Sequence, residues 1–232
     1  MKGAIMQPYF LPYIGYFQLI ASVDQFIVYD NIKYTKKGWI NRNRMLLNST
    51  DTMFSLPLKK GSDSLDVVER ELAENFDRTK LLNQFRGAYG AAAYFDQTYP
   101  VLERIVCHED ANLFRYIHHS IVQLCEYLGI ETEIRISSEI AIDHELKGQE
   151  KVLALCKAVR ADTYINTIGG IELYDKDYFR SQGINLQFIK ARLFDYPQFG
   201  APFVSWLSIV DTLMFNPLNV VRACINENYE LV

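Results

Sequence analysis

The chain has 232 residues, with 24 lysines and arginines against 28 aspartates and glutamates, a formal net charge of -4 and a pI of about 5.6. This acidic balance argues against a nucleic-acid-binding protein and against a protein that adheres to anionic membranes. A hydrophobic content of 49% and a charged content of 22% are ordinary for a globular protein with a sizeable core. We therefore expect one α/β domain over residues 1–232 that acts on a small molecule.

The four cysteines are widely separated and form no CxxC pair, and no histidine spacing is typical of a zinc site. We therefore expect reduced core cysteines and no metal. The first residues lack the basic and long apolar regions of a signal peptide, and no apolar run reaches the length of a membrane span. These features predict a cytoplasmic protein without membrane insertion.

The first thirty residues predict a βαβ unit. A short strand ends at Met6, and Pro8 and Pro12 then keep the chain extended, so the helix cannot begin before about Pro12. Gly15 permits close backbone approach near the helix start, and residues 25–30 form a second apolar strand. Ligands of open α/β sheets bind at such strand-to-helix loops, while the alternative is a well-packed aromatic corner. The candidate binding residues in this unit are Gln7, Tyr9 and Tyr16.

Residues 34–44 hold the densest collection of hydrogen-bond donors in the sequence. Arginine presents a planar fork that suits phosphate or carboxylate, and lysine a mobile point charge. Since this segment follows the second strand, it should lie on the same edge of the sheet as the first loop. We interpret it as a site for a nucleotide-sugar or a carboxylated substrate; the alternative is a solvated basic loop paired with nearby acids. The candidate binding residues are Lys36, Lys37, Asn41, Arg42, Asn43 and Arg44, with Tyr34 and Trp39 between them.

Two segments interrupt the alternation of strands and helices. Residues 31–70 predict a β insertion that carries the basic loop, with strands over 40–47, 52–58 and 65–69. Residues 78–129 predict a helical insertion, in which apolar residues recur at three and four positions before Gly129. His118 and His119 are adjacent on a helix and point in different directions, so we interpret them as surface or packing residues.

A second βαβ unit follows, with strands over 161–166 and 185–189 and a helix over 171–182. The resulting alternation predicts a mainly parallel, Rossmann-like sheet with helices on both faces. Glycines at the strand-to-helix turn would let backbone amides approach a phosphate or sugar, although a tight connection explains them equally well. The candidate binding residues of this unit are Asn166, Gly169, Gly170 and Tyr174.

The last part of the chain combines an aromatic loop over 192–200 with a predicted helix over 203–215. Ser205 is the expected cap of this helix, and Trp206 belongs to its apolar stripe. Asp211 lies among apolar residues and needs a partner if it is buried. We interpret it as a member of a structural ion pair, with orientation of a substrate amine as the alternative.

Several short segments have a distinctive sequence, and they include Gln7-Pro8, Leu11-Pro12, Gly15-Tyr16-Phe17, Asn41-Arg42-Asn43, 56–60, 161–170 and 207–211. Together they resemble the WbqC-like family of bacterial proteins, and the resemblance extends over essentially the whole chain. The family is associated with O-antigen and surface-polysaccharide gene clusters, and transfer of glycine onto a sugar amine has been suggested for its members. The position before Gln7 is commonly histidine in the family and is Met6 here, so the resemblance does not carry a histidine-based mechanism to this chain.

Three hypotheses for the function follow. The first is a transferase that passes an aminoacyl (glycyl) or acyl group to a nucleotide-linked amino sugar, with Asp24 or Asp30 as the general base; its surface-polysaccharide setting is what the resemblance implies. The second is a nucleotidylyltransferase-like enzyme, because the loop before Gly15 is similar to an HxGH region, although Tyr13 and Tyr16 stand at the histidine positions. The third is a non-catalytic nucleotide- or sugar-binding protein or scaffold.

Overall fold

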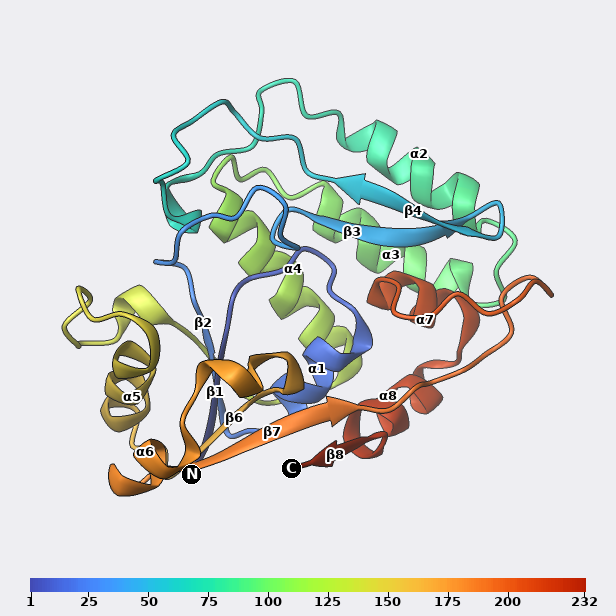
Figure 1. The fold of residues 1–232 in the computed structure, drawn as a ribbon. Coiled ribbons are helices and arrows are strands. Elements are labelled where there is room, and N and C mark those ends of the chain that lie inside the picture. Colours follow the sequence, from blue (N-terminus) through green and yellow to red (C-terminus); the bar gives the residue numbers. More distant parts are fainter.

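A six-stranded sheet forms the centre of the computed structural model, which describes residues 1–232 (Figure 1). Its strands are β1 (Lys2–Met6), β2 (Gln25–Val28), β5 (Glu133–Ile136), β6 (Thr163–Thr167), β7 (Asn185–Ala191) and β8 (Tyr229–Leu231). The strand order is β5-β2-β1-β6-β7-β8, and only β8 runs antiparallel to its neighbour. The mainly parallel, Rossmann-like sheet predicted from the alternation of strands and helices is thus confirmed.

Successive strand residues point into two different cores, which explains why the strands read as continuous apolar runs. In β1, Ala4 packs into the larger core and Ile5 into the smaller one. In β2, Phe26 and Val28 join the larger core while Ile27 joins the smaller one. Helices therefore cover both faces, as predicted. The larger core includes α1 (Ile14–Ala21), α4 (Leu113–Leu128) and α8 (Leu218–Glu227), and the smaller one α5 (Gly148–Ala158) and α6 (Lys176–Ser181).

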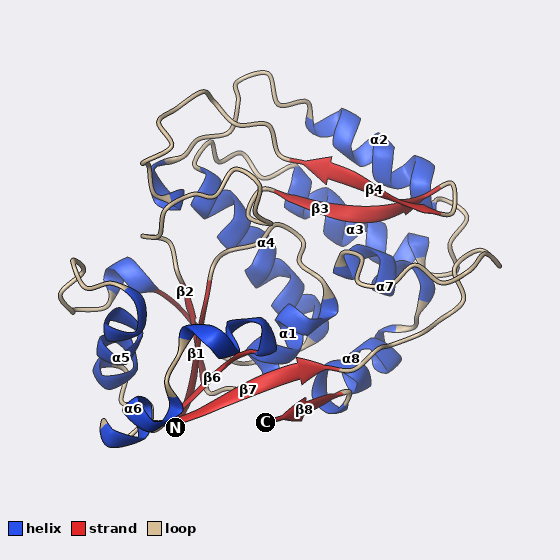
Figure 2. Ribbon diagram, in the orientation of Figure 1, coloured by secondary structure: helices blue, strands red, loops and turns tan.

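Between β2 and β5 the chain builds a second layer of structure. Two antiparallel strands form a separate ribbon, which Figure 2 shows beside α2 and away from the main sheet. Helix α2 packs on β3, and α3 packs on α7. The elements of this layer are β3 (Arg42–Leu47), β4 (Thr50–Ser55), α2 (Arg78–Tyr89) and α3 (Phe95–Val106), and α7 (Ile209–Phe215) reaches it from the C-terminal part.

Three local predictions are corrected by the structure. The strand expected over 65–69 is a 3₁₀ turn, η1 (Val67–Glu69), because Asp66 and Glu69 form a capping box. The helix expected over 171–182 is divided into η3 (Ile168–Leu173) and α6, because Asp175 accepts hydrogen bonds from the amides of two following residues and starts a new helix. The helix expected over 203–215 begins only at α7, where Ser208 instead of Ser205 is the cap.

Candidate ligand-binding pocket

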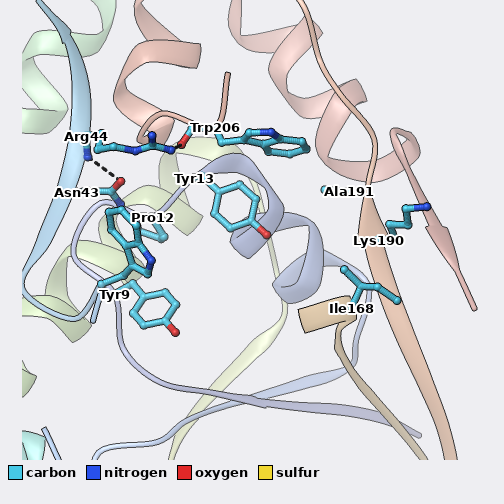
Figure 3. A pocket seen from close by; sticks show the side chains of 10 residues that line it. Tyr9, Pro12, Tyr13, Asn43, Arg44, Ile168, Lys190, Ala191 and Trp206 are labelled. Carbon is cyan, nitrogen blue, oxygen red and sulfur yellow. Dashed lines mark hydrogen bonds between the residues drawn. The ribbon is translucent and has the colours of Figure 1, made fainter. Parts of the chain in front are cut away.

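A cavity of about 440 Å³ lies where the strand order reverses between β1 and β6. From β1 the chain continues to β2 on one side, and from β6 it continues to β7 on the other. Crevices at such reversal points are preferred ligand sites in open α/β sheets. Tyr9 lines the cavity from the loop after β1, and Ile168 from the start of η3 after β6. The lining residues are Tyr9, Pro12, Tyr13, Trp39, Asn43, Arg44, Ile168, Lys190, Ala191 and Trp206 (Figure 3).

Four of the ten lining residues are aromatic. Both tryptophans of the chain take part, and 42% of Trp39 and 45% of Trp206 are exposed. Trp206 meets the ring of Tyr13 edge-on with 6.0 Å between centroids, and the Tyr13 hydroxyl points toward Ile168 in Figure 3. Burial raises the pKa of both Tyr13 and Tyr9, so their phenols stay protonated at neutral pH and can donate hydrogen bonds. This lining suits a flat ring or the apolar face of a sugar.

The Tyr13 ring lies against the start of α1 because residue 15 is glycine. Tyr13 precedes α1 in an extended conformation, with φ of -71° and ψ of 166°. A Cβ placed on Gly15 would lie only 2.4 Å from Cε2 of Tyr13. The close approach that Gly15 was expected to permit is therefore made by the Tyr13 side chain.

Asparagine side chains hold the loop between β1 and α1 against β3. The Asn43 amide nitrogen donates to the carbonyl oxygens of Leu11 at 2.9 Å and Phe10 at 3.4 Å. Leu11 has a φ of +45°, in the left-handed region that non-glycine residues rarely adopt, so this loop needs such support. Asn41 accepts a hydrogen bond from the Tyr34 hydroxyl at 2.8 Å and lies outside the lining. Of these two predicted binding residues, only Asn43 reaches the cavity.

Arg44 links two walls of the cavity. Its guanidinium bonds to Asp51 at 3.0 Å and to the Trp206 carbonyl oxygen at 3.1 Å. The guanidinium carbon also lies 5.7 Å from the centre of the Trp39 ring, a cation–π distance. Its Nε is buried without a hydrogen-bond partner. Arg44 therefore joins β3 to the loop that carries Trp206.

The segment before α7 places Trp206 at the cavity by a series of backbone bonds. Trp206 has a φ of +59°, a costly conformation that persists only where its surroundings enforce it. The Ser208 amide donates to the Arg44 carbonyl oxygen at 2.9 Å, and the Ile209 amide to that of Pro12 at 2.8 Å. The Ser208 hydroxyl donates to the Leu11 carbonyl oxygen at 2.7 Å. Residues far apart in the chain are thus fixed around one cavity.

Lys190, at the carboxyl end of β7, contributes a second cation to the lining. Its ammonium forms an ion pair with Glu230 of β8 at 3.3 Å. Figure 3 shows this ammonium directed away from the other lining side chains. Both cations of the lining are therefore paired with carboxylates of the chain itself.

The other predicted basic residues lie outside the lining. Lys36 pairs with Asp63 at 2.7 Å, and both side chains are well exposed. Arg42 donates from Nε to the Gly38 carbonyl oxygen at 2.9 Å and from Nη2 to that of Lys37. Arg42 thus holds the turn before Trp39, while Lys37 is exposed.

Gln7 and Tyr16 lie outside the lining of the cavity and are bonded to each other. Tyr16 is 1% exposed, and its hydroxyl donates to the Gln7 backbone carbonyl oxygen at 2.9 Å. The Tyr16 ring lies 5.6 Å from that of Tyr9, which lines the cavity. Of the three binding residues predicted in the first βαβ unit, Tyr9 alone reaches the cavity.

The two predicted catalytic carboxylates lie at opposite ends of β2. Asp24 precedes the strand, where its carboxylate accepts a hydrogen bond from the Lys2 amide at 2.8 Å. Asp30 follows the strand and is 1% exposed. Its carboxylate accepts a hydrogen bond from the Ser137 hydroxyl at 2.7 Å. It also accepts hydrogen bonds from the Ser138 hydroxyl at 2.6 Å and from the Ser138 amide at 2.9 Å. Neither lines the cavity.

The binding residues predicted at the end of β6 and in the segment that follows do not line the cavity, although Ile168 of that segment does. Asn166 is buried, and its side-chain oxygen accepts from the Thr167 amide at 2.7 Å. A Cβ on Gly170 would lie 2.8 Å from the Asn166 amide nitrogen, whereas Gly169 faces open space. Tyr174 packs edge-on against buried aromatic rings.

Seven lining residues were not among the sequence-based site predictions. The sequence places Trp39 within the basic loop as an aromatic residue and predicts Trp206 to be part of a helical stripe. Lys190 and Ala191 are the last residues of β7. Because ligands bind at the carboxyl ends of parallel strands, this position could have identified them as pocket residues. The others are Pro12, Tyr13 and Ile168.

Comparisons with known proteins identify relatives. A model of the WbqC-like protein family matches residues 7–223. An uncharacterized protein of Mycobacterium tuberculosis (strain ATCC 25618 / H37Rv) is 30% identical over 220 residues, which cover 93% of each chain. No solved structure gives a significant match. None of the helices has the length and apolar character needed to cross a bilayer, and no group of three or more histidine, cysteine or carboxylate side chains is placed to hold a metal ion.

Proposed function

Because the chain belongs to the WbqC-like protein family, we propose that it acts in the biosynthesis of bacterial surface polysaccharides of the O-antigen type. In this proposal it is a transferase that passes an aminoacyl (glycyl) or acyl group to a nucleotide-linked amino sugar. The observation that carries the proposal is the aromatic cavity at the reversal point between β1 and β6. Its volume of about 440 Å³ lies in the range of small-molecule sites.

The cavity holds the ring of the ligand. Trp39 and Trp206 offer exposed faces for stacking, and the phenols of Tyr9 and Tyr13 donate hydrogen bonds to ring hydroxyl groups. Holding the amino sugar in one orientation beside the acyl donor lowers the entropic barrier to attack by its amine. The contribution of this chain to the reaction is thus first of all positioning.

Phosphate groups of the ligand lie toward Arg44. This guanidinium is 29% exposed and its partner Asp51 is 48% exposed, so the ion pair is weak and a phosphate competes with it readily. Arginine suits phosphate because its nitrogen atoms match two oxygens at once. Lys190 supplies a second cation if its exposed pair with Glu230 opens.

One observation favours a non-catalytic sugar- or nucleotide-binding function as the second candidate. The lining residues include neither a carboxylate nor a histidine. The only ionisable side chains among them are two tyrosines, whose pKa is raised by burial, one arginine and one lysine. A lining of this kind binds a ligand without supplying a general base, which is what a non-catalytic binding protein requires.

The test is to incubate the protein with a nucleotide-linked amino sugar and an activated glycyl or acyl donor and to follow the sugar by mass spectrometry. The proposal expects a mass increase equal to the transferred group, with loss of that product in Trp206→Ala. The matched control is Met53→Ala, which removes another exposed hydrophobic side chain that does not line the cavity. Binding without turnover would support the second candidate, and equal turnover in both variants would exclude this cavity.

A further inference from the structure

Asp211 is a buried carboxylate that the proposed binding chemistry does not use. It is 0% exposed on α7 and accepts hydrogen bonds from the Tyr89 hydroxyl at 3.1 Å, the Tyr196 hydroxyl at 2.8 Å and the Gln198 amide at 2.6 Å. Burial raises the pKa of Asp211, and these three hydrogen bonds oppose that rise. All three partners are neutral, so the structural ion pair expected from the sequence is not present.

One arm of this network reaches the β3 wall of the pocket. The Tyr89 hydroxyl, which donates to Asp211, also accepts a hydrogen bond from the Leu46 amide at 2.9 Å. Leu46 lies in β3, two residues after Arg44. The network is therefore bonded directly to the strand that supplies Asn43 and Arg44 to the cavity.

The other arm reaches the wall that carries Trp206. The Gln198 side chain accepts from the Val204 amide at 2.7 Å and donates to the Val204 carbonyl oxygen at 3.1 Å, so it closes residues 198–204 into a loop. The same side chain donates to Asp211. Trp206 follows two residues later with its left-handed backbone.

We propose that Asp211 is a positioning residue that ties the β3 wall to the Trp206 loop and thereby sets the shape of the pocket. Every partner of its carboxylate donates a hydrogen bond, and two of them belong to the chain that leads into Trp206. An apolar residue at 211 would leave buried donors unpaired, which proteins avoid. The inference rests on the proposed function only for the identity of the ligand, not for the geometry.

The experiment uses Tyr196→Phe and Gln198→Leu, which remove donors to Asp211 and retain most of the side-chain volume. Each is made in a Trp39→Phe background, where Trp206 is the single tryptophan. The positioning role predicts a changed emission maximum and stronger acrylamide quenching of Trp206 in both variants. In the otherwise unaltered chain, the same two changes weaken binding of a nucleotide-linked amino sugar about tenfold, as expected if only about a tenth of the unliganded molecules keep Trp206 in its binding position.

The matched control is Thr98→Val. Thr98 is 1% exposed and its hydroxyl donates to the Leu213 carbonyl oxygen of α7 at 3.1 Å, so the change removes another buried bond to the same helix without touching the loop. Folded variants whose Trp206 quenching equals that of the control would overturn the positioning role. If quenching changes as predicted while no sugar nucleotide binds the unaltered protein, the proposed function fails and the positioning role stands.

Discussion

At the scale of single residues, Gly15 shows how a missing side chain shapes the pocket. We predict that Gly15→Ala displaces the Tyr13 ring, because the new Cβ would lie 2.4 Å from it. The new Cβ meets only atoms at the far end of the Tyr13 side chain, which can rotate away from it. Ligand affinity should therefore fall more than the free energy of unfolding does. Isothermal titration calorimetry with a nucleotide-linked amino sugar measures the first effect, and thermal unfolding the second.

Gly87→Ala is the control for this change. Gly87 lies within α2, and a Cβ there meets nothing within 4 Å. Alanine should therefore stabilise the helix by roughly 0.5–1 kcal/mol without altering binding. Equal ligand affinity in the two variants would show that Tyr13 takes no part in binding.

Some residues of the pocket could be predicted from residue type and position in the sequence. Others line it only because of a backbone conformation that the sequence does not reveal. Tyr9, Asn43 and Arg44 were identified because loop position and donor chemistry are legible in a sequence. Trp206 was assigned to a helix because its spacing fits an apolar stripe, whereas its φ of +59° excludes it from one. Asp24 and Asp30 were predicted as catalytic residues because carboxylates can act as general bases. The structure instead gives Asp30 a structural role, since it is buried and accepts hydrogen bonds from the hydroxyls of Ser137 and Ser138.

At the scale of elements, Ser208 joins α7 to the loop after β1. We predict that Ser208→Ala lowers the free energy of unfolding by about 1–2 kcal/mol, the usual loss for a buried helix cap. Its hydroxyl accepts from the Val210 amide at 3.3 Å and donates to the Leu11 carbonyl oxygen at 2.7 Å. Chemical denaturation measures the loss.

The control is Ser181→Ala, which removes an exposed hydroxyl bond within α6 and should change the free energy of unfolding by less than about 0.5 kcal/mol. Equal losses in the two variants would show that the Ser208 hydroxyl does not stabilise the junction between α7 and the loop after β1.

An ion pair between β7 and β8 involves Lys190, one of the two cations that line the pocket. Glu230 lies 3.3 Å from Lys190 and 3.9 Å from Arg192. We predict that Glu230→Gln strengthens binding of phosphate-bearing ligands because it frees both cations, and that stability changes by less than about 1 kcal/mol because the pairs are exposed. Titration at low and high salt measures the gain, which should shrink as salt rises. Unchanged affinity at low salt would remove Lys190 from the site.

The order of elements was predictable because strands and helices alternate along the chain. Their ends were less predictable, since capping by Asp175 and Ser208 depends on where the backbone turns and not on apolar spacing. The separate β3-β4 ribbon was anticipated as strands, but its contact with α2 depends on tertiary packing. We propose that residues 31–70 and 78–129 are insertions in a single domain over 1–232.

At the scale of the whole molecule, stability should depend on pH through two partly buried histidines, His118 and His119. Burial lowers the pKa of His118 below its ordinary value of 6.5, and the Nε2 atom is buried without a partner. The unfolded chain therefore binds a proton more readily, so this stabilisation is full above about pH 6.5 and declines as pH falls through the lowered pKa. We predict that His118→Gln reduces the difference in free energy of unfolding between pH 7 and pH 5.

Burial also lowers the pKa of His119, so this residue likewise makes the protein less stable as pH falls. The His118→Gln variant should therefore keep part of the difference in free energy of unfolding between pH 7 and pH 5. Asp211 acts in the opposite sense, because its raised pKa contributes stability that is lost as pH rises. An unchanged difference in His118→Gln would show that His118 does not titrate in this window.

The central claim is that the cavity between β1 and β6 is the ligand site. Both tryptophans of the chain line that cavity, so tryptophan fluorescence reports on it without any label. We would titrate the unaltered protein with nucleotide-linked amino sugars and follow the emission alongside thermal unfolding. We predict a saturable change in emission at the same concentrations that raise the unfolding temperature. A ligand that raises the unfolding temperature without changing the emission would place the site elsewhere and contradict the account.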